Sequence, residues 1–160
     1  MKKVNPEYIR NLIFGAEDSL VSTVGVIFGV ASAAIDSSTI LLTGFIVIAV
    51  ESLSMGAGAF LSETSTKELS EEAPHNNPII SGVLMFIAYF VTGFIPVSPY
   101  MFFEISTAKY LSVGVTFIAL FLLGFLPQKR VKTGLRMVVV AGDAVVMGFA
   151  IGTFFKIEGI

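Results

Sequence analysis

The residues best suited to chemistry lie in one apolar stretch, VESLSMGAGAFLS, which begins at Val50. Glu51 supplies a carboxylate and Met55 a thioether, and residues four apart on a helix share one face. An acidic side chain at membrane depth is costly, which marks Glu51 as a candidate functional residue. A carboxylate beside a soft sulfur atom favours a transition-metal ion over Ca²⁺ or Mg²⁺, which prefer oxygen ligands.

A second pair of acids, Glu17 and Asp18, lies in the sequence FGAEDSLVSTVG. Neighbouring residues on a helix are about 100° apart, so at most one of these carboxylates can point straight into a shared site. Ser22 follows Asp18 by four residues and shares its face. Either acid could belong to an ion pathway, with Ser22 as a possible contributor. The alternative is that both acids lie in water at the cytoplasmic end of their span.

A single acid, Asp143, lies in the apolar sequence VVVAGDAVVMG near the C-terminus. At mid-membrane it could relay a proton, neutralise a cation, or pair with Arg136, two turns earlier. Met147 follows Asp143 by four residues and so repeats the spacing of Glu51 and Met55. Asp143 is therefore a possible pathway residue, with a buried ion pair as the alternative.

A polar connector, ETSTKELSEEAPHNN, separates two apolar stretches and holds four acids, Glu63, Glu68, Glu71 and Glu72. Acids at a cytoplasmic mouth would concentrate cations there. The spacing of Glu72 and His75 is that of di-iron carboxylate helices. Pro74 lies between them and breaks the helix that such a site requires. We therefore expect a solvated loop that steers cations electrostatically.

Composition places the chain in a membrane. Of its 160 residues, 54% are hydrophobic and 14% are charged, whereas charged residues make up about a quarter of a soluble chain. The absence of cysteine excludes disulfides and thiolate metal sites. With one histidine, no phosphate-binding glycine loop and no basic, aromatic-rich surface, the sequence favours neither an enzyme nor a nucleic-acid-binding protein.

Five segments are apolar and long enough, at roughly 20 residues each, to cross a bilayer. We therefore predict an all-α integral membrane protein, with residues 1–160 forming one transmembrane domain. The expected spans are residues 11–34, 39–62, 78–95, 106–126 and 133–155.

The distribution of lysine and arginine predicts the orientation, because cytoplasmic loops are enriched in both. An odd number of spans places the two termini on opposite sides, and one side holds only Lys109 and Lys156. We therefore expect a cytoplasmic N-terminus and a C-terminus that is outside or lumenal. Arg136 lies within the fifth span, and the seven other cations fall on the cytoplasmic side: Lys2, Lys3, Arg10, Lys67, Lys129, Arg130 and Lys132.

Glycines spaced four residues apart are expected to bring helices together. Gly25 and Gly29 form one such pair, and Gly148 and Gly152 form another. This spacing lets helix backbones approach closely. Because five spans make a small bundle, we also expect a homodimer, with the pathway at or near the dimer interface.

Three stretches resemble the vacuolar iron transporter family: FGAEDSLVSTVGVIFGVA, ESLSMGAGAFLS and PIISGVLMFIAYFVTGFIPVSPY. The resemblance covers nearly the whole chain. It implies a five-span homodimer with a cytosolic N-terminus, and proton-coupled export of Fe²⁺, often with Mn²⁺ accepted. By position, Asp18, Glu51 and Met55 correspond to pathway residues of that family.

The chain departs from the family pattern at three points. Asp18 is followed by Ser19 where the family usually has glycine, and Ala59-Phe60 stands where many members have Glu-Tyr. Only the short connector replaces the glutamate-rich metal-binding domain that longer members carry between the second and third spans.

We therefore expect a secondary transporter that exports Fe²⁺, or Mn²⁺, from the cytosol against protons and needs no cofactor. It would lie in the plasma membrane of a prokaryote or in a vacuolar-type membrane otherwise. Two alternatives stay open: an uncoupled metal or cation channel, and a non-transporting scaffold whose acids pair internally with Arg136 or Lys132.

Overall fold

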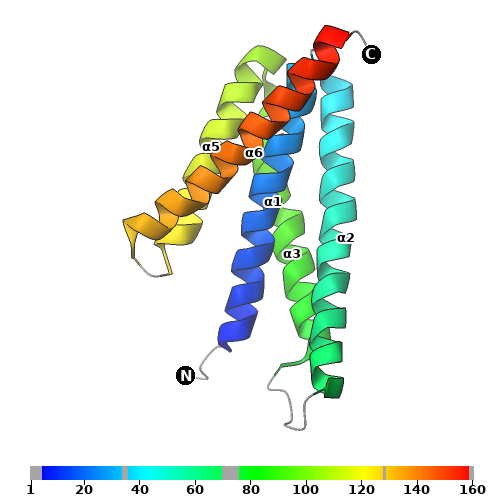
Figure 1. Cartoon of the computed structure of the whole chain (residues 1–160), viewed down its shortest axis with the longest axis vertical. Helices are drawn as coiled ribbons and strands as arrows, with labels where there is room; N and C mark the ends of the chain where they lie inside the picture. Colours follow the sequence, from blue (N-terminus) through cyan, green and yellow to red (C-terminus); the bar gives the residue numbers. More distant parts are fainter. Residues whose placement is uncertain (1–4, 34–35, 70–75, 128, 159–160) are drawn as a thin grey trace.

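The computed structural model of the chain describes residues 5–33, 36–69, 76–127 and 129–158, and these residues are mostly helical. Five of the described helices are long and apolar enough to cross a membrane, as the sequence predicts. A short helix, α4, lies between the third and fourth of them (Figure 1). The helices are α1 (Pro6–Ser32), α2 (Ser37–Leu69), α3 (Pro78–Val97), α4 (Pro99–Phe102), α5 (Ile105–Phe125) and α6 (Val131–Glu158).

Asparagine followed by proline begins two of the long helices. Asn5 accepts a hydrogen bond from the backbone N–H of Glu7, and Asn77 accepts one from that of Ile79. The proline after each asparagine needs no N–H at the first helical position. Helix α1 therefore begins at Pro6, five residues before the predicted start of the first span.

Helix α2 begins beside Asp36, whose carboxylate accepts hydrogen bonds from the N–H and hydroxyl groups of Thr39, at 3.1 and 2.7 Å. The bond from the Thr39 hydroxyl, supported by the backbone bonds, holds the pKa of Asp36 below its usual value.

The predicted solvated loop after the second span is wrong for residues 63–69. Helix α2 continues to Leu69 because the polar residues there include no glycine or proline that would break it. The Thr64 and Thr66 hydroxyls donate to the carbonyl oxygens of Phe60 and Ser62, along the helix surface. Two of the predicted entrance acids, Glu63 and Glu68, therefore lie on a helix.

The third span also runs further than predicted, through Pro96 to Val97. Ser98 donates its backbone N–H to the Phe94 carbonyl, so the last turn stays closed although Pro96 has no N–H to donate. Ser112 on α5 donates its hydroxyl to the Pro96 carbonyl at 2.6 Å. Helix α4, which follows directly, was not predicted.

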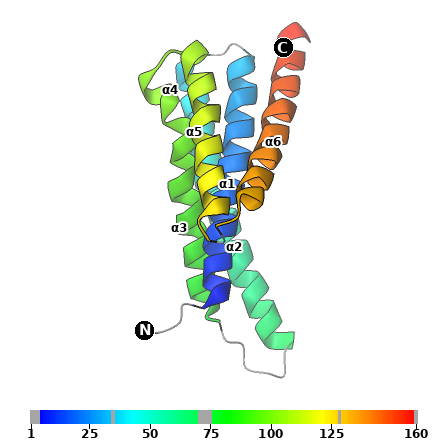
Figure 2. The ribbon, with the colours of Figure 1, turned by 90° about the vertical axis from the view of Figure 1, so that its left-hand side faces the viewer.

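Helix α1 is the central helix of the bundle and packs against α2, α3, α5 and α6 (Figure 1). The two termini lie at opposite ends. The amino end of the bundle holds the start of α1, the end of α2 and the start of α3. The carboxyl end holds the end of α1, the start of α2, helix α4 and the end of α6 (Figure 2). Many large apolar side chains on the outer surfaces are exposed, as suits contact with lipid.

The two glycine pairs pack against each other within one chain, where α6 crosses α1. A Cβ atom added to Gly148 would lie 2.1 Å from the carbonyl oxygen of Gly25, and one added to Gly152 would lie 2.0 Å from that of Gly29. Only hydrogen fits at these positions, so the expected close approach of backbones is confirmed.

Candidate functional site

Asp18 and Glu51 come together near the middle of the bundle. Asp18 is half-buried on α1 and Glu51 is exposed on α2. Their carboxylates are close enough to interact electrostatically. Asp18 lies twelve residues after the first residue of α1, which is about 18 Å along its axis. The site is therefore deep in a helix that is long and apolar enough to cross a membrane.

Glycines on α2 and α3 allow the two helices that carry the acids to pack closely against α3. A Cβ atom on Gly82 of α3 would lie 2.8 Å from the Gly56 carbonyl on α2. A Cβ atom on Gly93 would lie 2.7 Å from Ile48 on α2 and 2.9 Å from the Ser19 hydroxyl on α1. Helices α1 and α2 thus both lie close against α3, which sets the distance between their carboxylates.

A residue that sequence reasoning missed, Tyr89 on α3, completes this cluster. Its phenol oxygen lies 2.6 Å from the Ser22 hydroxyl, and both Asp18 and Glu51 act on it electrostatically. The Ser19 hydroxyl donates to the Tyr89 carbonyl at 2.7 Å and fixes α3 against α1. The available signal was a phenol within the apolar, phenylalanine-rich third span, because a buried phenol normally requires a hydrogen-bond partner.

A groove of about 1020 Å³ opens at the amino end of the bundle, between the N-terminal half of α1 and the C-terminal half of α2. Met55 and Glu17 line this groove, and Glu51 lies one turn from Met55 on α2. Asn11, which also lines it, is only 5% exposed, and its side-chain nitrogen has no hydrogen-bond partner among the described residues. The groove also includes Met85 and Glu63, so two thioethers and two carboxylates face one space.

Among the described residues, no basic side chain forms an ion pair with Glu17, Asp18 or Glu51. Asp18 interacts electrostatically with Glu17 as well as with Glu51. In the described part of the chain the one ion pair joins Arg10 and Glu7, at 3.0 Å. Like charges held together in a membrane span need a cation or a proton to compensate them. The arrangement can therefore exchange protons and cations at one place.

The described residues of one chain do not bring three acids or histidines together around one ion. Among the residues that the structure describes, no three histidine, cysteine, aspartate or glutamate side chains come close enough to hold one ion. Glu51 is exposed, as are Ser54 and Gly58 on the same stretch of α2. The polar part of the site is thus open on one side.

The remaining candidates lie apart from this cluster. Asp143 is exposed on α6, and within the described residues it forms no ion pair with Arg136, which is also exposed. Glu63 accepts a long hydrogen bond of 3.5 Å from Ser81, and Glu68 is exposed. Glu71 and Glu72, together with the histidine of the alternative di-iron site, lie outside the described residues.

Comparison with known proteins identifies relatives of the chain. The chain is 27% identical over 171 residues to the uncharacterized protein MJ0645 of Methanocaldococcus jannaschii, an alignment that covers 91% of this chain and 89% of the relative. The VIT family model matches residues 9–74 and 67–153, which together cover most of every long helix and include both acids of the central cluster. The chain therefore belongs to the VIT family, the vacuolar iron transporter family of membrane proteins.

Proposed function

We propose that the protein exports Fe²⁺, and also Mn²⁺, from the cytosol in exchange for protons. The observation that carries this proposal is the pair Asp18 and Glu51, two interacting carboxylates inside a membrane-crossing bundle with no basic partner among the described residues. Deprotonated, the pair binds a divalent cation. Protonated, it is neutral, so the empty site can return without carrying bare charge through lipid.

The thioethers of Met55 and Met85 support a transition metal as the cargo. They line the groove that leads from the amino end of the bundle toward Glu51. Thioether sulfur favours softer ions, whereas Mg²⁺ and Ca²⁺ prefer oxygen ligands. With the amino end in the cytosol, as the distribution of lysine and arginine indicates, metal enters by this groove, and Glu63 and Glu68 concentrate cations near it.

A second copy of the chain would complete the site. Glu51, Ser54 and Gly58 are exposed on α2, and a carboxylate facing lipid at this depth is costly. A homodimer related by a two-fold axis beside this face would cover it and supply a second set of acids. The four central carboxylates of such a dimer would exceed the number that either chain brings together alone.

Reconstituted vesicles test the coupling. An acidic lumen should accelerate uptake of Fe²⁺ severalfold over uptake without a pH gradient, because protons leaving the vesicle drive metal in. The measurements are quenching of a metal-sensitive dye and the reading of a pH-sensitive dye, both trapped in the lumen. An ionophore that collapses the pH gradient should remove the acceleration. A channel would give the same Fe²⁺ flux with and without the gradient, and that result would refute proton exchange.

Met55→Leu tests the metal preference. Loss of the sulfur should weaken Fe²⁺ transport about tenfold, or roughly 1.4 kcal/mol, while competition by Mg²⁺ changes little. The measurement is the apparent affinity for Fe²⁺ in vesicles, with and without excess Mg²⁺. Met147→Leu is the matched control, because Met147 is exposed on α6 and does not line the groove. Equal effects on the two metals would show that Met55 only packs.

A further inference from the structure

Three buried hydroxyl groups in the carboxyl-end half of the bundle have no hydrogen-bond partner among the described residues. They belong to Thr23 on α1, Thr116 on α5 and Tyr100 on α4. The two threonines are fully buried, and Tyr100 is 3% exposed. An unpaired buried hydroxyl costs about 1–3 kcal/mol, so three in one small bundle require an explanation.

The two threonines differ from others in the same molecule. The hydroxyls of Thr43, Thr64 and Thr92 each donate to the carbonyl oxygen four residues earlier, at 2.7 to 2.8 Å. This is the usual bond of threonine inside a helix. Thr23 and Thr116 do not make it. Their hydroxyls are therefore available to groups outside their own helices.

These hydroxyls continue a path that begins at the central acids. Asp18 and Glu51 act on the Tyr89 phenol, which is hydrogen-bonded to Ser22. The hydroxyl of Thr23 lies beside the same phenol, although the two oxygens do not have the geometry of a hydrogen bond. The first step from the carboxylates toward the carboxyl end thus leads from the Tyr89 phenol to the Thr23 hydroxyl beside it.

Thr116 lies at nearly the same depth as Thr23. Leu20 of α1 and Leu120 of α5 belong to one buried cluster. Helices α1 and α5 run in opposite directions, so Thr23, three residues after Leu20, and Thr116, four residues before Leu120, both lie about 4.5–6 Å nearer the carboxyl end.

The path then reaches the carboxyl end of the bundle. Ser112 lies one further turn along the same face of α5 and donates its hydroxyl to the Pro96 carbonyl. The phenol of Tyr100 lies beside Ser112, again without hydrogen-bond geometry. Tyr100 belongs to α4, which forms part of this end of the molecule (Figure 2).

We propose that Tyr89, Thr23, Thr116, Ser112 and Tyr100, with water between them, conduct protons from the carboxyl end of the bundle to Asp18 and Glu51. This inference rests on the proposed exchange of metal for protons. A turn of helix separates hydroxyls by about 6 Å, and one water bridges oxygens about 5.5 Å apart. Each hydroxyl accepts a proton on one side and releases its own on the other, and for Ser112 this requires the hydroxyl to turn away from the Pro96 carbonyl. The net step moves one proton from the outer solution to a carboxylate and leaves no hydroxyl charged.

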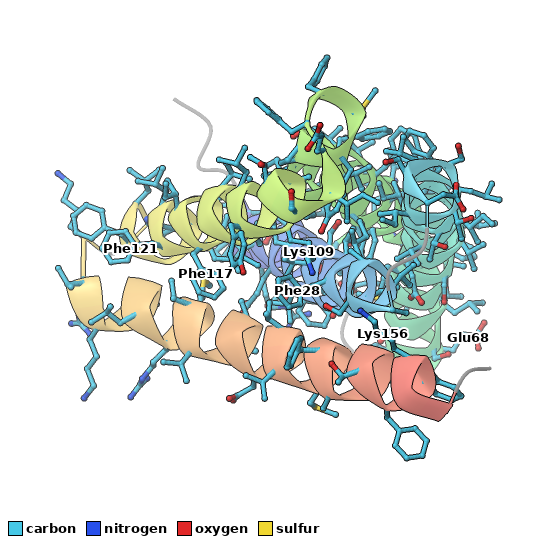
Figure 3. The ribbon with its side chains drawn as sticks, turned by 90° about the horizontal axis from the view of Figure 1, so that it is seen from above. Phe28, Glu68, Lys109, Phe117, Phe121 and Lys156 are labelled. Atoms are coloured by element: carbon cyan, nitrogen blue, oxygen red, sulfur yellow. The ribbon has the colours of Figure 1, made fainter. Side chains whose placement is uncertain are left out.

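The surroundings of the path exclude the metal. Apolar residues of one buried cluster, including Ile27, Ile40 and Val97, surround its outer part, and a divalent ion would lose its water there without charged ligands. Lys109 lies one turn beyond Ser112 on α5, with its amine over the Phe28 ring, 5.9 Å from the centroid (Figure 3). A positive side chain at this end repels a divalent ion twice as strongly as a proton. Protons and metal would thus reach the same acids by different routes.

The test is the double variant Thr23→Val/Thr116→Val, which keeps the shape of both side chains and removes both hydroxyls. In vesicles with an acidic lumen, proton-driven Fe²⁺ uptake should fall about tenfold or more, since proton transfer limits it. Exchange of radioactive Mn²⁺ for unlabelled Mn²⁺ needs no proton and should stay within about twofold of the wild type. The melting temperature should not fall, because removing an unpaired buried hydroxyl is neutral or stabilising.

Thr43→Val is the matched control, since the Thr43 hydroxyl bonds to its own helix on α2 and lies outside the path. It should leave both proton-driven uptake and exchange unchanged. Wild-type rates of proton-driven uptake in the double variant would overturn the path and leave metal–proton exchange standing. Equal losses of uptake and exchange would show that the hydroxyls serve only structure. A wild type that moves metal without protons would overturn both the path and the proposed exchange.

Discussion

Glu51→Gln is expected to abolish metal transport and to leave the protein folded. Glutamine has nearly the same shape as glutamate, but its amide is a poor metal ligand and cannot take up a proton at this site. Glu51 is exposed on α2 and forms no ion pair among the described residues, so its replacement breaks no packing contact or salt bridge there. The flux of Fe²⁺ should fall by at least about a hundredfold, equal to roughly 2.7 kcal/mol.

Transport by Glu51→Gln is measured in vesicles, and folding by the melting temperature in detergent. Glu104→Gln is the matched control, because Glu104 is exposed at the start of α5 and its side chain makes no capping hydrogen bond. The control should transport at the wild-type rate. Wild-type flux in Glu51→Gln itself would remove this residue from the mechanism and leave Asp18 without its partner acid.

Gly152→Ala should lower the stability of the folded protein more than any other substitution proposed for this chain. The new methyl group would lie 2.0 Å from the Gly29 carbonyl oxygen, and backbone on both helices must move to admit it. Overpacking of this kind costs typically 1–3 kcal/mol, and a contact with backbone belongs at the upper end of that range. The expected result is a clear drop in melting temperature and loss of transport.

Gly142→Ala controls for the change in helix propensity on the same helix. A Cβ atom on Gly142 would meet no atom within 4 Å, so this variant should be as stable as the wild type or slightly more stable. Equal melting temperatures for Gly152→Ala and the wild type would mean that α1 and α6 do not pack through their glycines in the membrane.

The sequence predicts the spans well because one property, sustained hydropathy, decides them. The glycine spacing predicts that helix backbones approach closely, because it has a direct geometric meaning, but it does not predict that α1 and α6 are the helices that meet. Hydropathy also misplaces the end of α2, since Glu63 and Glu68 are polar but do not oppose helix formation. Hydropathy indicates which residues lie within the membrane, but it does not show where a helix ends.

The central site could be predicted in part. The acids Asp18 and Glu51 stand out because charge is rare in these spans, and the structure brings them together. Tyr89, Thr23 and Thr116 do not stand out. In a membrane helix the faces toward lipid and toward the core are both apolar, so periodicity does not reveal which hydroxyls are buried. Contacts between helices are needed to find them.

The length of α2 has a consequence for the connector. Its 33 residues extend for about 50 Å, whereas the hydrocarbon core of a bilayer is about 30 Å thick. The excess needs no nucleation of its own, because the helix continues from the part held in the bundle. The C-terminal turns of α2 extend beyond the bundle and diverge from α1 and α3 (Figure 2). A domain inserted after Leu69 would therefore have its position and direction relative to the membrane fixed by the end of α2. A relative with a longer connector would need no additional element to position such a domain.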